Sequence, residues 1–245
     1  MQPAPTALAL ASLFGHAAPP KLGGLLGALN SGGLPKTSAG MFSGLAPAKV
    51  RNVFYSFHYQ DVLRVNQVRN SGKIRPTDKG RQLTVQDRSL WEKVKRTNPR
   101  NLKTVIDSGL GGTSITCVLA GYETWSREWV RYEIGRSVVR GNGLLTVHIH
   151  GCKCPNAGYG LPGHNPLNDM ALGSDHRLWE RRGGQWVHYD KISERVPTWP
   201  LWLNRPAPGF VMPLSTGTHA YDWVADDGFN NLIHWTNLAA AAANK

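Results

Sequence analysis

"TSITCVLAGYETWSREWVRYEI", residues 113–134, decides the fold class. Its first part, residues 113–121, is apolar and rich in β-branched side chains, and it ends at a glycine, which predicts a buried central strand. Its second part, continued by "GRSVVRGNG", has the apolar spacing of a helix, and Gly141 and Gly143 indicate where that helix stops. The stretch therefore predicts a strand followed by a packed helix, which is one step of a parallel βαβ unit.

The segments around this stretch continue the alternation of strands and helices. Further strands are expected at 52–57 and 144–150, and helices at 61–70, at 89–110 with an interruption at Asn98-Pro99, and at 226–245. Residues 151 to about 215 are rich in Pro, Gly and Trp, which favours an ordered, loop-rich excursion near the C-terminus. The sequence thus predicts an α/β fold with a central parallel sheet flanked by helices.

The charge balance indicates the class of partner. The 245 residues carry a formal net charge of +12, which favours anionic partners such as nucleic acid, phosphorylated small molecules or membrane surfaces. No basic run is interleaved with aromatic residues as in a recognisable nucleic-acid module, so no specific nucleic-acid partner is expected. The sequence also contains no run of eighteen apolar residues of the kind that spans a membrane.

The N-terminal residues differ from the rest. Residues 1–48 are rich in Ala, Gly, Leu and Pro, and Lys21 and Lys36 are their only fully charged side chains. Too many glycines separate the leucines for a stable isolated helix. We interpret 1–48 as a low-complexity leader and 49–245 as the folded domain; the leader is either a loosely ordered tail or a self-association or membrane-touching arm.

The cysteines and nearby histidines suggest a metal site, but the spacing of these residues argues against one. Cys117, Cys152 and Cys154 are odd in number, so no disulfide framework is implied, and a reducing, cytoplasmic compartment is expected. "HIHGCKCPNAGYGLPGH", residues 148–164, contains the ligand types of a zinc site. The Cys-x-Cys spacing is tighter than the usual two-residue spacing of zinc ligands, and the first two histidines of this segment, His148 and His150, alternate along a predicted strand. We therefore expect no metal there.

Two segments should meet where a ligand would bind. In an open parallel sheet, ligands bind outside the carboxyl ends of the strands. "SFHYQD", residues 56–61, and "GYETWSREW", residues 121–129, each follow a predicted strand. Trp129 and Glu133 are four residues apart and therefore share a helix face. The Glu133 side chain leans back towards the helix N-terminus, and so towards this cleft.

Several motifs together resemble a known family. "RNVFYSFHYQDVLRVNQVRNSG", "TSITCVLAGYETWSREWVRYEI", "GNGLLTVHIH" and "YDWVADDGFNNLIHWTNLAAAA" resemble the TIR-like domain of the Thoeris antiphage system, over roughly residues 51–243. The resemblance implies a flavodoxin-like TIR fold and cleavage of NAD⁺, with NAD⁺ as substrate and no further cofactor. In TIR NADases the catalytic glutamate lies on the helix after a central strand, with a tryptophan four residues earlier, and Glu133 and Trp129 match this pair.

The resemblance also implies partners. Thoeris TIR proteins make cyclic ADP-ribose-type signals after phage infection, and these activate a separate NAD-consuming effector. The expected partners are therefore NAD⁺, further copies of the chain in a homo-oligomer, a phage-derived trigger, and an effector linked through a diffusible nucleotide. The alternative is a non-enzymatic TIR-like scaffold that binds nucleotide or a partner protein.

The residues alone leave local alternatives open. Glu133 could instead pair with Arg136 or Arg140 on an exposed helix face, while Trp129 packs in the core.

Further candidates flank this pair. Phe57, His58 and Tyr59 could contact adenine or nicotinamide, or could only pack and cap the loop. Arg64 and Arg69 could reach phosphate, or could lie on a solvated helix face.

Overall fold

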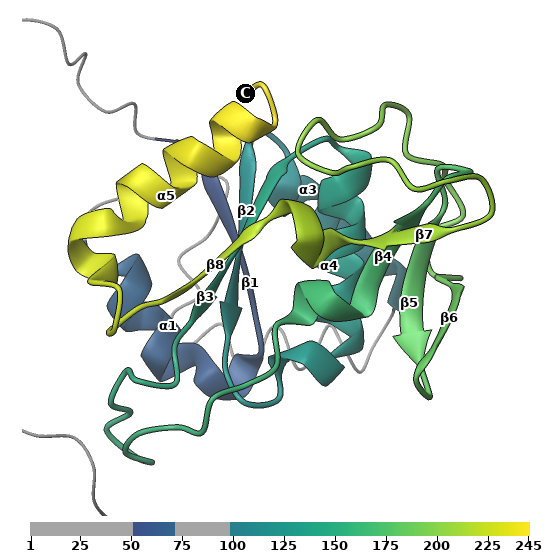
Figure 1. Ribbon diagram of the computed structural model, residues 1–245. Coiled ribbons are helices and arrows are strands. Elements are labelled where there is room, and N and C mark those ends of the chain that lie inside the picture. The colour runs from purple at the N-terminus through teal and green to yellow at the C-terminus, as the bar shows by residue number, and fades with distance from the viewer. Residues whose placement is uncertain (1–50, 72–98) are drawn as a thin grey trace, which may run out of the picture. The chain divides into compact units, whose positions relative to one another are not determined.

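A computed structural model describes residues 51–71 and 99–245 (Figure 1). The predicted leader, residues 1–48, and the part of the expected helix that precedes Pro99 lie outside the described residues. Pro99 is the first residue of a helix, a position where its missing N–H costs nothing.

The central sheet is parallel. It consists of β1 (Val53–Phe57), β2 (Ile115–Ala120), β3 (Gly143–His148) and β8 (His219–Asp222), in the spatial order β1-β2-β3-β8. Within the described ranges, this is the flavodoxin-like order 2-1-3-4-5 without its outermost strand 2. Every residue of β2 is buried, as the apolar composition of this segment predicted. The expected α/β fold with a central parallel sheet is confirmed.

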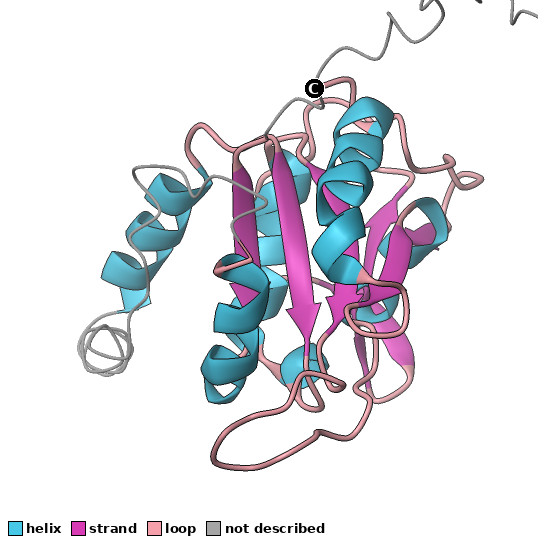
Figure 2. Ribbon diagram, turned by 90° about the vertical axis from the view of Figure 1, so that its left-hand side faces the viewer, coloured by secondary structure: helices cyan, strands magenta, loops and turns pink. Residues whose placement is uncertain are grey.

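Helices cover both faces of this sheet (Figures 1 and 2). α1 (Val62–Arg69) and α5 (Gly228–Ala242) pack on one face, where Val65 and Leu232 share a core with β2 and β3. α3 (Pro99–Leu110) and α4 (Glu128–Val139) pack on the other, where Ile106 and Ile134 belong to a second core. The sheet is therefore buried between two apolar layers, as in doubly wound proteins.

The C-terminal excursion is ordered and contains a second sheet. Its strands are β4 (Met170–Gly173), β5 (Leu178–Arg182), β6 (Gln185–His188) and β7 (Val211–Pro213), antiparallel in the order β6-β5-β4-β7. The sequence predicted an ordered, loop-rich excursion here but did not predict these strands.

The excursion holds α4 against the central sheet. A Cβ added at Gly135 would lie 2.8 Å from Ile192 Cδ1, so the glycine lets side chains of the excursion pack closely against the helix. Arg131 on α4 also forms a largely buried ion pair with Glu180 on β5, at 2.7 Å. Because α4 is packed on both sides, the side chains that it presents to β1 have a rigid support.

α1 begins without a side-chain cap, whereas α4 ends at a glycine as the sequence predicted. Asp61 occupies the N-cap position of α1 but makes no capping bond through its side chain, which pairs with Arg64 instead. The predicted stop of α4 is confirmed: Gly141 has φ of 70°, and its N–H donates to the Val138 carbonyl.

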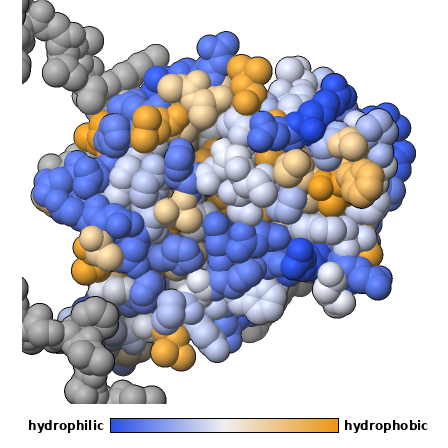
Figure 3. Space-filling view, viewed as in Figure 1, coloured by the Kyte–Doolittle hydropathy of each residue, from blue (hydrophilic) through white to orange (hydrophobic). Residues whose placement is uncertain are grey.

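The surface in the view of Figure 3 is mixed, with hydrophobic residues scattered among hydrophilic ones. No helix of the described segments has the length and apolar character needed to cross a membrane.

Candidate active site

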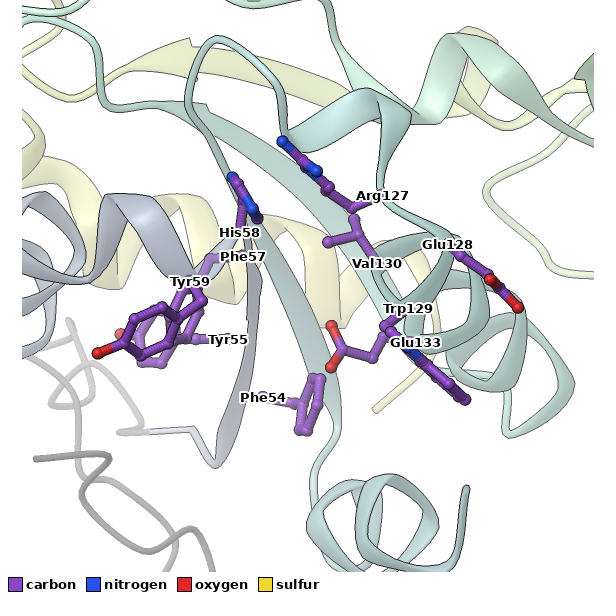
Figure 4. Close-up of a pocket in the computed structure, with 10 residues that line it drawn as sticks. All are labelled: Phe54, Tyr55, Phe57, His58, Tyr59, Arg127, Glu128, Trp129, Val130 and Glu133. Atoms are coloured by element: carbon purple, nitrogen blue, oxygen red, sulfur yellow. The ribbon is translucent and has the colours of Figure 1, made fainter. Parts of the chain in front are cut away.

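A cavity of about 310 Å³ lies along β1 and the first turns of α4 (Figure 4). It is lined by ten described residues: Phe54, Tyr55, Phe57, His58, Tyr59, Arg127, Glu128, Trp129, Val130 and Glu133. Residues from the two segments that follow β1 and β2 thus meet at one cavity. The structure brings five of the seven candidates from the sequence to it: Phe57, His58, Tyr59, Trp129 and Glu133.

Glu133 is a buried carboxylate. Its residue is only 5% exposed, and its Oε2 accepts a hydrogen bond of 2.6 Å from the hydroxyl of Ser56, which is fully buried on β1. The alternative of an ion pair on an exposed helix face is therefore wrong. Arg136, one of the expected partners, pairs with Asp107 and Glu194 instead.

A chain of buried polar groups fixes α4 behind Glu133. The Ser137 hydroxyl donates to the Glu133 carbonyl oxygen at 2.7 Å and lies 2.7 Å from the Thr116 hydroxyl on β2. Since the single Ser137 proton goes to this carbonyl, the Thr116 hydroxyl donates to Ser137, and Thr116 in turn accepts from the Asn142 amide. The chain ties the helix turn that carries Glu133 to the centre of the sheet.

Trp129 is both a pocket wall and part of the packing. It is half-buried against the core on the α4 side of the sheet and meets the Tyr132 ring edge to face, with ring centroids 5.9 Å apart. In Figure 4 the indole and the Glu133 carboxylate leave α4 in different directions. The indole thus borders the cavity without lying over the carboxylate.

The aromatic residues of β1 divide between its two sides. Phe54 belongs to the core beside α4, whereas Tyr55 and Phe57 pack against the core beside α1. Figure 4 accordingly shows Tyr55, Phe57 and Tyr59 across the strand from Phe54 and the carboxylate. Burial raises the pKa of the Tyr55 phenol, so this group stays neutral. The cavity therefore extends around the end of β1.

Arg64 and Arg69 are not among the lining residues. Arg64 is 9% exposed, so the alternative of a solvated helix face is wrong for this residue. Its guanidinium pairs with Asp61 at 3.2 Å and donates to the carbonyls of Cys152 and Gly158 at 3.2 and 3.1 Å. Arg64 thus fastens the loop after β3 to α1. Arg69 is half-buried in the last turn of α1.

Arg127 is a lining residue that the sequence interpretation missed. It is the N-cap residue of α4 and lines this cavity and also a second one. Its guanidinium forms an exposed ion pair with Glu123. The position of Arg127 could have identified it as a lining residue, because it lies two residues before Trp129 in a segment already expected at the cleft.

The histidine and cysteine stretch shows no metal geometry. Among residues 51–71 and 99–245, no three His, Cys, Asp or Glu side chains are grouped so that they could hold a metal ion. Cys152 and Cys154 are buried thiols, and the rings of His148 and His150 lie 6.3 Å apart. Burial, and secondarily the neighbouring His150, lowers the pKa of His148. The expected lack of a metal stays a prediction.

Comparison with known proteins decides the family. A family model described as the TIR-like domain of the Thoeris protein ThsB matches residues 54–153. A curated relative from Bacillus cereus (strain MSX-D12), named "Putative cyclic ADP-D-ribose synthase ThsB1", is 40% identical over 200 residues, which cover 76% of this chain and 99% of the relative. This chain belongs to the Thoeris TIR-like family. All ten lining residues fall within the matched range of this Thoeris TIR-like protein.

Proposed function

We propose that this Thoeris TIR-like protein cleaves the nicotinamide glycosidic bond of NAD⁺ and makes a cyclic ADP-ribose-type signal in bacterial antiphage defence. The name of the Bacillus cereus relative supports the reaction class. The observation that carries the proposal is the buried Glu133 carboxylate, held by Ser56 at a cavity wide enough for a nucleoside.

The chemistry needs one well-placed carboxylate. When the bond between the ribose C1 carbon and the nicotinamide nitrogen breaks, both electrons leave with nicotinamide. Its ring nitrogen already carries a positive charge, so it departs as a neutral molecule and needs no general acid. The ribose becomes an oxocarbenium-like cation, which a nearby carboxylate stabilises.

Burial strengthens this stabilisation. Glu133 lies in a setting of low effective dielectric, where its attraction for a developing cation exceeds that in water. Trp129 and Phe54 offer apolar walls for the nicotinamide ring and exclude water. Phe57, His58 and Tyr59 contact the substrate around the end of β1. The contacts of Arg64 give it a structural role instead.

The fate of the cation sets the product. Attack by an adenine ring nitrogen closes a ring and leaves the positive charge on the cyclic product, and attack by a hydroxyl of the adenosine half closes a ring and releases a proton. Attack by water gives the open product and also releases a proton. A wall that keeps water from the ribose therefore favours the cyclic signal.

The remaining features of the proposal are supported by the family resemblance and, for the compartment, by the cysteine content. The protein uses NAD⁺ as substrate without a further cofactor and works as a homo-oligomer in the cytoplasm. A phage-derived trigger activates it, and a diffusible nucleotide carries its signal to an effector protein.

Glu133→Gln tests the proposal, because it keeps the side-chain shape and removes the charge. Nicotinamide release from NAD⁺ is measured on the full-length protein, with and without extract of phage-infected cells. Its rate should be about a hundredfold or more lower for Glu133→Gln than for wild type. Mass spectrometry of the product distinguishes the cyclic form from the open form. The matched control is Glu194→Gln, which removes an exposed carboxylate outside the cavity and should keep the rate. Equal rates for wild type and Glu133→Gln would remove Glu133 from the mechanism, and NAD⁺ binding without cleavage would favour the scaffold alternative.

A further inference from the structure

A second, more open cavity of about 670 Å³ adjoins the first. Its lining comes from the loop between β2 and α4 and from the chain that follows β3: Tyr122, Glu123, Trp125, Ser126, Arg127, His164 and Asp169. Arg127 lines both cavities, so a single guanidinium stands at their junction.

The hydrogen bonding of Arg127 points to an anion. Its Nε is buried, and no acceptor among the described residues lies within hydrogen-bond range of that atom. Nη2 of the same guanidinium pairs with Glu123. A buried N–H without an acceptor is costly, and a phosphate oxygen would satisfy it with a charge-assisted hydrogen bond. In Figure 4 the Arg127 side chain extends towards His58, at the edge of the first cavity.

The walls of the second cavity suit a nucleobase. Trp125 is 39% exposed and Tyr122 is 57% exposed, although both are large aromatic side chains beside a hollow. The His164 ring meets Trp125 edge to face, with ring centroids 5.9 Å apart. His164 Nε2 also lies 3.2 Å from Asp169 Oδ2, a buried oxygen that accepts no hydrogen bond from the described residues. Exposed aromatic faces of this kind stack on bases.

The order of these groups matches a dinucleotide. Glu133 follows Arg127 by six residues, which is about 9 Å along the helix axis, and its side chain leans back towards Arg127. Trp125 lies on the other side of Arg127 in the sequence, in the turn before the helix. Along the chain, the carboxylate, the guanidinium and the aromatic wall therefore follow one another in the order of ribose, pyrophosphate and adenosine in NAD⁺.

We propose that the two cavities form one bipartite dinucleotide site, in which Arg127 binds the pyrophosphate and the second cavity holds the adenosine half. The orientation of the dinucleotide rests on the proposed function, because Glu133 must face the nicotinamide ribose. Arg127 would thus supply part of the binding energy and hold the dinucleotide in register with the carboxylate.

Two partial ligands test the two halves of the site separately. ADP carries adenosine and the pyrophosphate without nicotinamide, and nicotinamide mononucleotide carries the other half with one phosphate. Calorimetric titration of the full-length protein should give ADP affinities roughly tenfold to a hundredfold weaker for Arg127→Gln. Trp125→Ala should weaken ADP about fivefold or more through lost stacking, and should leave the affinity for nicotinamide mononucleotide unchanged.

Matched controls lie outside both cavities. Arg195→Gln removes the charge of an exposed arginine, and Tyr159→Ala removes an aromatic ring that is 71% exposed; neither should change either affinity. Melting temperatures of all variants check that they fold. If Trp125→Ala does not fold, His164→Ala removes a half-exposed wall of the same cavity and should weaken ADP alone.

The outcomes separate this inference from the proposed function. NAD⁺ cleavage that depends on Glu133, together with ADP binding that ignores Arg127 and Trp125, would overturn the bipartite site and leave the proposed reaction intact. ADP binding that depends on Arg127 and Trp125, without any NAD⁺ cleavage, would support the site and overturn the reaction. Equal loss of both partial ligands in Trp125→Ala would overturn the assignment of adenosine to the second cavity.

Discussion

Ser56→Ala should weaken both the fold and the reaction, because the hydroxyl of Ser56 holds the carboxylate of Glu133. The hydroxyl donates to Glu133 Oε2 at 2.6 Å, and the two residues are 0% and 5% exposed. Alanine keeps nearly the same volume, so the substitution removes the donor and opens little space. Its effect therefore reports on the hydrogen bond rather than on a cavity.

The magnitude follows from the charge of the acceptor. A hydrogen bond to a charged group contributes about 1.5–3 kcal/mol to the free energy of unfolding, and one between neutral groups about 0.5–1.5 kcal/mol. Ser56→Ala should therefore cost roughly 1 kcal/mol more when residue 133 is Glu than when it has been changed to Gln. For a domain of this size, each kcal/mol lowers the melting temperature by about 2–4 °C.

Urea unfolding of four proteins measures this difference: wild type, Ser56→Ala, Glu133→Gln and the double variant. Nicotinamide release by Ser56→Ala should show a kcat reduced about tenfold with a smaller change in KM, since a carboxylate without this hydrogen bond binds NAD⁺ but faces the ribose less often. Ser193→Ala, an exposed serine, is the control and should change stability by less than about 0.5 kcal/mol. An identical cost of Ser56→Ala in both backgrounds, with unchanged kcat, would refute the reasoning.

Three further predictions concern regions outside the cavity. Arg64→Ala should lower the free energy of unfolding by about 3–5 kcal/mol in thermal or urea unfolding, because Asp61 stays buried without its cation; a weaker KM for NAD⁺ in folded protein would instead place Arg64 at the substrate. Protein purified without nickel should contain far less than one zinc per chain by elemental analysis, and a stoichiometric zinc lost in a Cys152→Ser, Cys154→Ser double variant would contradict this. Deletion of residues 1–48 should leave a folded domain with a nearly unchanged melting temperature; if the leader is a self-association arm, light scattering should show a smaller assembly and NAD⁺ cleavage should fall with it.

The central βαβ unit could be predicted closely because its signals are local. The strand expected at 113–121 is β2, Ile115–Ala120, and the helix stop expected at Gly141 is where α4 ends. The second sheet could not be predicted in the same way. Its strands have three to five residues, and one of them ends in Pro213. Such short strands are stabilised by pairing with distant partners, which a single sequence does not display.

The same contrast between local signals and distant contacts applies to the candidate site. The pair of Trp129 and Glu133 was visible because a helix brings residues four apart onto one face. Ser56 was not visible, although it lay in a quoted segment, because its partner is 77 positions away in the sequence. The spacing of Trp129 and Glu133 indicated a carboxylate at the cleft. Only the packing of α4 on β1 shows that the Ser56 hydroxyl orients this carboxylate.

The assignment of the phosphate-binding arginine depends on tertiary structure for a related reason. A net charge of +12 indicates that cations are available for an anionic substrate, but the net charge does not tell which arginine would bind the phosphate. What separates them is how many of their donors are already used. Arg64 donates to one carboxylate and two carbonyls, whereas the buried Nε of Arg127 meets no acceptor among the described residues. Since an anion gains most from the arginine whose hydrogen bonds the fold has left incomplete, the chemistry favours Arg127 over Arg64.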